Sequence, residues 1–151
     1  MTQLSQAKDN TPPIVKWLGY GGLLPFVISA AALAIGASHS NLWLQALVGY
    51  GAVILSFVGA LHWGFAMTHP DMALPERSQS FLWSVVPSLV AWLALLLDPE
   101  LACALLIIGF LLHLYRDKHV ARLVSMPSWY WPLRWRLTLV ACLSLLSGWF
   151  I

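Results

Sequence analysis

A long apolar run of the chain extends from residue 41 to 67 and contains no Asp, Glu, Lys or Arg. Four further apolar segments, at 17–37, 80–97, 101–115 and 137–151, are also free of these residues. A helix needs about 20 apolar residues to cross a bilayer, and lipid forces the backbone of each span to hydrogen-bond internally. The sequence therefore predicts an all-α fold, a polytopic helical membrane bundle of about five transmembrane helices.

The overall composition supports a membrane protein. Only 9% of the 151 residues are charged, whereas soluble domains carry about 25%. We expect a polar N-terminal tail at 1–16 and one transmembrane domain at 17–151. The first apolar run follows a long polar lead and has the length of a span, which favours a retained helix over a cleaved signal peptide.

The basic residues predict the orientation. Lys8 and Lys16 precede the first span, Arg77 follows the second, and the other five lie between residues 116 and 136. With five crossings all eight fall on one side, and the two short connections carry none. The positive-inside rule then predicts that the N-terminus lies inside and the C-terminus outside. We expect a multi-pass protein of the bacterial cytoplasmic (inner) membrane.

The segment from 118 to 136 is rich in Trp, Tyr and Arg and contains Pro127 and Pro132. Such residues favour the headgroup level, and proline interrupts helices, so we expect an interfacial segment here. Its cations and their neighbours predict contact with anionic lipid headgroups rather than nucleic acid: Arg116, Lys118, Arg122, Arg134 and Arg136.

Small residues recur every four positions along the second span. This spacing allows another helix to approach closely, so the stripe is a candidate surface for membrane-protein partners. It consists of Ala52, Ser56, Ala60 and Gly64.

His62 is an ionisable residue within the second span, and such residues are candidates for function. The simplest interpretation is that a neutral His62 donates to a carbonyl freed by Pro25 or Pro87, since proline removes a helical hydrogen bond. Gly59, one turn earlier, would leave space beside the imidazole. The alternatives are proton handling and hydrogen bonding to a quinone or a lipid head.

His113 on the fourth span is expected at a similar depth, and two histidines could hold haem b axially. We predict no cofactor and no metal, with haem and quinone as the open alternatives. Asp98, Glu100 and Asp117 are all interpreted as lying at helix ends, so no acid is expected beside His62 in the membrane. No hydrolase motif occurs, and no catalytic residue is assigned.

Four blocks resemble the domain-of-unknown-function family 3429, a family of membrane proteins from bacteria and animal mitochondria. They are GLLPF at 22–26, YGAVILSFVGALHWG at 50–64, VPSLVAWLALLL at 86–97 and PSWYWPLRWRLTL at 127–139. The resemblance implies a compact multi-helix membrane protein and assigns no activity. Its motifs, together with His113, define a candidate functional cluster: Gly59, His62, Trp63, Gly64, Pro87, Trp92 and His113.

The function predicted first is a non-enzymatic accessory or assembly partner of a larger membrane complex, because the chain has few polar groups for chemistry. The alternative is a binder or enzyme for a lipophilic ligand such as quinone, haem or lipid, with His62 as the polar contact. A small-molecule transporter comes third.

Overall fold

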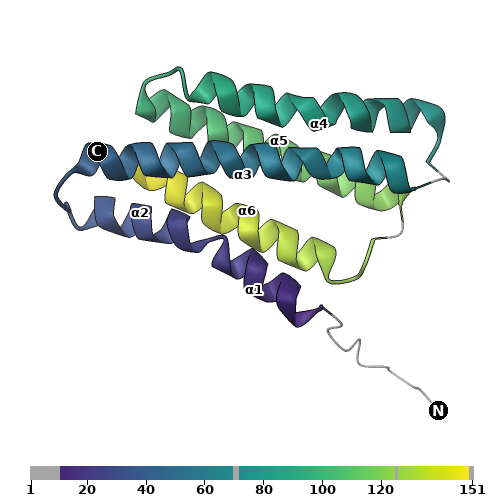
Figure 1. The fold of residues 1–151 in the computed structure, drawn as a ribbon, viewed down its shortest axis with the longest axis horizontal. Helices are drawn as coiled ribbons and strands as arrows, with labels where there is room; N and C mark the ends of the chain where they lie inside the picture. Colours follow the sequence, from purple (N-terminus) through teal and green to yellow (C-terminus); the bar gives the residue numbers. More distant parts are fainter. Residues whose placement is uncertain (1–10, 70–71, 125, 150–151) are drawn as a thin grey trace, which may run out of the picture.

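The computed structural model describes residues 11–69, 72–124 and 126–149, which form helices and connections without a strand. The helices pack side by side as an elongated bundle (Figure 1). Their bounds are α1 (Pro13–Gly21), α2 (Leu24–Ala34), α3 (Ser40–Thr68), α4 (Leu74–Ala94), α5 (Pro99–Leu123) and α6 (Tyr130–Ser147). The predicted all-helical bundle is confirmed.

Three segments of the described chain are long and apolar enough to cross a membrane: Pro13–Ala34, Ser40–Thr68 and Pro99–Leu123. The first comprises α1 and α2, which follow one another as a bent rod in Figure 1. The helices α4 and α6 lie alongside these spans in the same bundle. The total of five crossings stays a prediction supported by this arrangement.

The bend between α1 and α2 follows from proline, as the sequence predicts. Pro25 is in the first turn of α2, where it cannot donate a backbone hydrogen bond to the preceding helix. The hydroxyl of Tyr50 on α3 donates instead to the carbonyl of Gly22, at 2.8 Å. A side chain of the neighbouring helix thus supplies a hydrogen bond to a backbone carbonyl at the break between the two helices.

The two ends of the bundle differ in charge. In Figure 1, α2 and α4 end and α3 and α5 begin at one end of the bundle, whereas α3 and α5 end and α4 and α6 begin at the other end, where α1 also begins. Every described Lys and Arg belongs to the end where α1 begins. Lys8 and most of the predicted 1–16 tail lie outside the described residues. The segregation of charge agrees with an inside-positive orientation.

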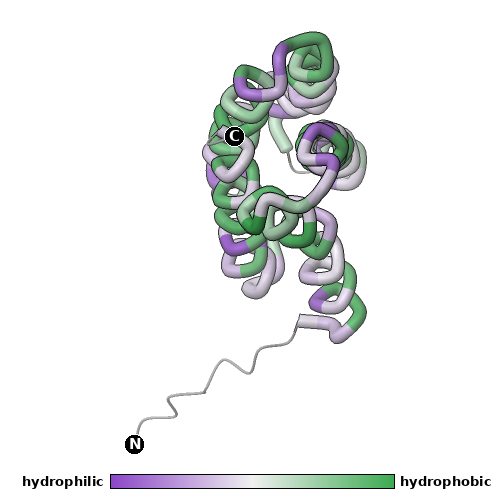
Figure 2. Tube along the Cα trace, turned by 90° about the vertical axis from the view of Figure 1, so that its left-hand side faces the viewer, coloured by the Kyte–Doolittle hydropathy of each residue, from purple (hydrophilic) through white to green (hydrophobic). Residues whose placement is uncertain are grey.

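The outer faces of the helices are apolar. Large hydrophobic side chains are exposed on all of them, including Trp17 (79% exposed), Leu82 (73%) and Phe57 (64%). Figure 2 shows that hydrophobic residues predominate along much of the bundle. Lipid is the solvent that such a surface requires.

The bounds of α5 and α6 differ from the predicted spans. The fourth span was expected to end at 115, but α5 continues to Leu123. The proposed interfacial segment 118–136 is therefore divided between the end of α5, a short connection and the first turns of α6. Pro132 lies in the first turn of α6 and does not break it, because an N–H there has no helical acceptor. Residues 125, 150 and 151 lie outside the described part.

The expectation that Gly59 leaves space beside His62 is wrong. A Cβ added at this position would lie 2.7 Å from the Cβ of Pro87 on α4. Pro87, which lies inside α4, fills the space instead. The glycine therefore allows α3 and α4 to touch at this point.

Candidate functional site

Four polar side chains from three helices meet in the apolar core. They are His62 on α3, His113 and Asp117 on α5, and Arg134 on α6. Both histidines are fully buried, Asp117 is 1% exposed and Arg134 is 6% exposed. Burying charges in a low-dielectric core is costly unless they are paired and hydrogen-bonded, so their contacts decide whether the cluster can exist.

The carboxylate of Asp117 joins the cluster. Its Oδ2 accepts from Nε of Arg134 at 2.5 Å, and its Oδ1 accepts from Nε2 of His62 at 2.9 Å. Nε2 of His113, one turn earlier on α5, lies 3.5 Å from the same Oδ1. One carboxylate thereby ties α3, α5 and α6 together and balances the charge of the buried guanidinium.

Trp83 of α4 determines the tautomer of His113. Its indole Nε1 donates to Nδ1 of His113 at 3.1 Å. An indole N–H can only donate, so Nδ1 must be the unprotonated acceptor. A neutral His113 then carries its proton on Nε2, the atom that faces Asp117.

We expect ¹⁵N chemical shifts of the purified protein to show His113 as the neutral Nε2–H tautomer. The variant Trp83→Phe removes the indole donor, and we expect the Nδ1 signal of His113 to move toward that of a free acceptor. Trp92→Phe is the matched control, because Trp92 is 58% exposed and outside the cluster. An Nδ1–H tautomer in the unmodified protein would contradict this assignment.

The two histidines and Asp117 have the residue types of a metal site. One ligand atom from each of His62, His113 and Asp117 lies within 4.8 Å of the others. A histidine ligand normally donates its second N–H to an acceptor, whereas Nδ1 of His113 already accepts from Trp83. With this hydrogen bond in place, a metal on Nε2 would require His113 to be an imidazolate, which has lost both ring protons. The hydrogen bond from Trp83 therefore argues against metal or haem ligation through Nε2 of His113.

Aromatic and aliphatic side chains cover the cluster toward the basic end of the bundle. The ring of Phe65 lies 5.8 Å from that of His62 and 6.1 Å from that of Tyr130. Phe65 also packs against a small core group formed by Met72, Val120 and Val124. These contacts separate the cluster from the connections at that end.

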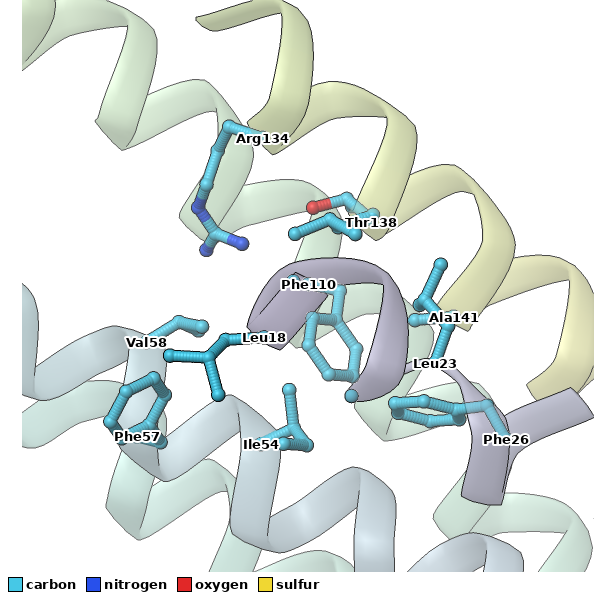
Figure 3. Close-up of a pocket in the computed structure, with 13 residues that line it drawn as sticks. Leu18, Leu23, Phe26, Ile54, Phe57, Val58, Phe110, Arg134, Thr138 and Ala141 are labelled. Atoms are coloured by element: carbon cyan, nitrogen blue, oxygen red, sulfur yellow. The ribbon is translucent and has the colours of Figure 1, made fainter. Parts of the chain in front are cut away.

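A pocket lies next to the cluster, between the bend of α1 and α2, helix α3 and helix α6 (Figure 3). Its volume is about 120 Å³. Most of its lining is apolar, but Arg134 and Thr138 lie one turn apart on its α6 side. Nη2 of Arg134 and Oγ1 of Thr138 are buried without a hydrogen-bond partner among the described residues. The pocket therefore offers two unused donors in an apolar surrounding.

The structure brings together part of the predicted cluster. His62 and His113 face each other, with ring centroids 5.0 Å apart, and Gly59 contacts Pro87. The remaining members lie on outward faces: Trp63 (49% exposed), Trp92 (58%) and the exposed Gly64.

Three sequence-based interpretations need correction. His62 pairs with Asp117 and not with a carbonyl freed by proline. Asp117 does not lie at a helix end, because α5 extends six residues beyond it to Leu123. Arg134 does not reach lipid headgroups, because its guanidinium pairs with Asp117 in the core.

Sequence reasoning missed four residues of the candidate site: Asp117, Arg134, Thr138 and Trp83. A signal for the first was present, since Asp117 follows His113 by four residues and shares its helix face. The same spacing relates Arg134 to Thr138. Both pairs become visible only when the helices are extended past the apolar runs.

Comparison with known proteins agrees with this architecture. The family described as "Protein of unknown function (DUF3429)" matches residues 11–150. Transmembrane protein 69 of Xenopus tropicalis is 38% identical over 145 residues, covering 95% of this chain and 56% of the relative. Transmembrane protein 69 of Mus musculus is 30% identical over 137 residues, covering 89% of this chain and 55% of the relative.

The chain thus spans about half the length of the curated relatives it matches. No solved structure matches it. The family match covers nearly the whole helical bundle, including every residue of the polar cluster and the pocket. This chain belongs to the DUF3429 family of transmembrane proteins.

Proposed function

We propose that this protein binds a lipophilic small molecule within the membrane, in the pocket beside Arg134 and Thr138. One observation carries the proposal: Arg134 and Thr138 line an apolar pocket, and two of their buried donors, Nη2 of Arg134 and Oγ1 of Thr138, have no partner among the described residues. An unsatisfied buried donor costs about 1–3 kcal/mol. A ligand with an acceptor oxygen would recover that free energy.

The lining suits the rest of such a ligand. Leu18 and Phe57, which are 69% and 64% exposed, line the pocket at the surface of the bundle. Ile54 and Phe110 also line the pocket. An apolar tail can therefore lie among these side chains and continue into lipid, which is the usual division between polar and apolar contacts in ligand pockets.

His62 has a different role from the one the sequence suggests. It does not line the pocket, so it is not the contact for the ligand. Its hydrogen bond to Oδ1 of Asp117 leaves Oδ2 for Arg134. We assign His62 as a positioning residue that helps to hold the guanidinium against the pocket.

Native mass spectrometry of the protein released from membranes tests the proposal. We expect a bound lipophilic molecule on the unmodified chain and about tenfold less on Thr138→Val, because one hydrogen bond of about 1.4 kcal/mol is lost. Thr68→Val is the matched control, since Thr68 is exposed and its hydroxyl donates to the carbonyl of Gly64 in its own helix. Equal occupancy in all three proteins would contradict the proposal.

An accessory role in a membrane complex is the second candidate. Ala52 and Ser56 of the small-residue stripe are buried or partly buried, while Ala60 and Gly64 are exposed on α3. A Cβ at Gly64 would meet nothing within 4 Å, which leaves room for another helix. Gly64→Leu should then lose co-purifying subunits that the unmodified protein retains; unchanged subunits would contradict this candidate.

The placement in the membrane belongs to the same proposal. We infer a multi-pass protein of the bacterial inner membrane with its basic end in the cytoplasm. The cations Lys118, Arg122 and Arg136 are exposed at that end and suit anionic headgroups. The guanidinium of Arg136 also lies over the ring of Trp135, at 5.7 Å, a pairing typical of the headgroup level.

A further inference from the structure

The buried cluster has no net charge. The negative charge of Asp117 offsets the positive charge of Arg134. His113 is neutral because its Nδ1 accepts a hydrogen bond from Trp83. Nδ1 of His62 is buried and has no partner among the described residues, so a proton there would be unsatisfied. A molecule entering the pocket therefore meets a donor whose charge is already compensated.

This charge balance limits the charge that the head group of a ligand can carry. A carboxylate or phosphate beside Arg134 would leave one uncompensated negative charge in a low-dielectric site, which is strongly unfavourable. A neutral carbonyl adds no charge and has two lone pairs. It can accept from both Nη2 of Arg134 and Oγ1 of Thr138.

We propose that the pocket selects lipophilic molecules with a neutral carbonyl head, such as an acyl ester or a quinone, over the corresponding acids, and that Asp117 sets this selectivity. The inference rests on the proposed function and adds the chemical class of the ligand. Asp117 does not line the pocket; it acts through Arg134. Removing its charge would convert the same pocket into a site for anions.

The experiment compares two ligands with the same tail, methyl myristate and myristate, at a pH where the acid is ionised in micelles. Binding of each radiolabelled ligand is measured by scintillation proximity on the 151-residue chain. We expect the unmodified protein to prefer the ester by about tenfold or more, and Asp117→Asn to prefer the acid. A short-tailed benzoquinone, offered as a competitor, distinguishes a quinone from an acyl ester as the source of the carbonyl.

Glu100→Gln is the matched control. It makes the same change in charge at an exposed position in the first turn of α5, and we expect it to keep the preference for the ester. Thr138→Val should weaken both ligands about equally, because it removes a shared donor.

The outcomes separate the two proposals. If the unmodified protein binds none of the three ligands, the proposed function fails. If it binds the acid as tightly as the ester, the selectivity is wrong while ligand binding stands. If Asp117→Asn remains monodisperse and helical but keeps the preference for the ester, Asp117 does not set the selectivity. The comparison in the unmodified protein needs no variant, so a failure of Asp117→Asn to fold does not remove the test.

Discussion

Asp117→Leu is expected to lower the free energy of unfolding by about 3–5 kcal/mol, because it leaves the buried guanidinium of Arg134 without its counter-charge. The same change removes the acceptor of His62, at 2.9 Å in the native protein. Unfolding in mixed micelles, followed by far-UV circular dichroism as the fraction of denaturing detergent rises, measures the loss. Glu100→Leu, at an exposed helix start, should change stability little.

The double variant Asp117→Leu/Arg134→Met distinguishes the loss of the ion pair from the loss of side-chain packing. Replacing both members of a buried ion pair by apolar side chains is often neutral or stabilising. We therefore expect the double variant to be more stable than Asp117→Leu alone, and to approach the unmodified protein. If the losses of the two single variants simply add, the ion pair is not the interaction that holds α5 to α6.

Gly59→Leu is the second substitution with a large expected effect. A Cβ at this position would lie 2.7 Å from Cβ of Pro87, and both groups belong to packed helices that cannot turn aside as a flexible side chain could. Overpacking of this kind costs about 1–3 kcal/mol or more. The same unfolding assay should show this loss for Gly59→Leu, while Gly64→Leu, where a Cβ would meet nothing within 4 Å, should stay near the unmodified protein.

Pro87→Ala supplies the test of the mechanism. Removing the ring should recover part of the stability that Gly59→Leu loses, because the contact involves Cβ, Cγ and Cδ of that proline. If Gly59→Leu and Gly64→Leu are equally stable, close approach of α3 and α4 at Gly59 is not required.

The sequence predicts the large-scale features of the bundle well. Runs without charge mark most of the helices, the basic residues mark one end, and Pro25 marks the bend between α1 and α2. These features depend on each residue's own preference for lipid, water or backbone conformation. Such preferences are readable one position at a time.

The centre of the candidate site depends on contacts between helices, which hydropathy does not report. The fourth apolar run stops at residue 115 because charged residues follow, and the helix was therefore expected to stop there too. Asp117 remains in the core because the charge and hydrogen bond of Arg134, on a different helix, offset the cost of burying the carboxylate. Neither charge would be predicted inside the bundle without knowledge of the other.

Gly59 and Trp83 show the same limit at single positions. A glycine in an apolar helix indicates close approach, but the sequence does not say that Pro87 is the group that approaches. In the sequence nothing distinguishes Trp83 from the other tryptophans, whereas in the structure its indole N–H donates to His113.

A structure of the protein determined in nanodiscs of native lipid, with a rigid antibody fragment to aid alignment, tests the central claim most directly. We predict density for an elongated molecule between the α1–α2 bend, α3 and α6, with its polar end at Nη2 of Arg134 and Oγ1 of Thr138. An empty pocket in which both donors bond to the protein's own atoms, or an Arg134 that reaches the lipid headgroups away from Asp117, would contradict it.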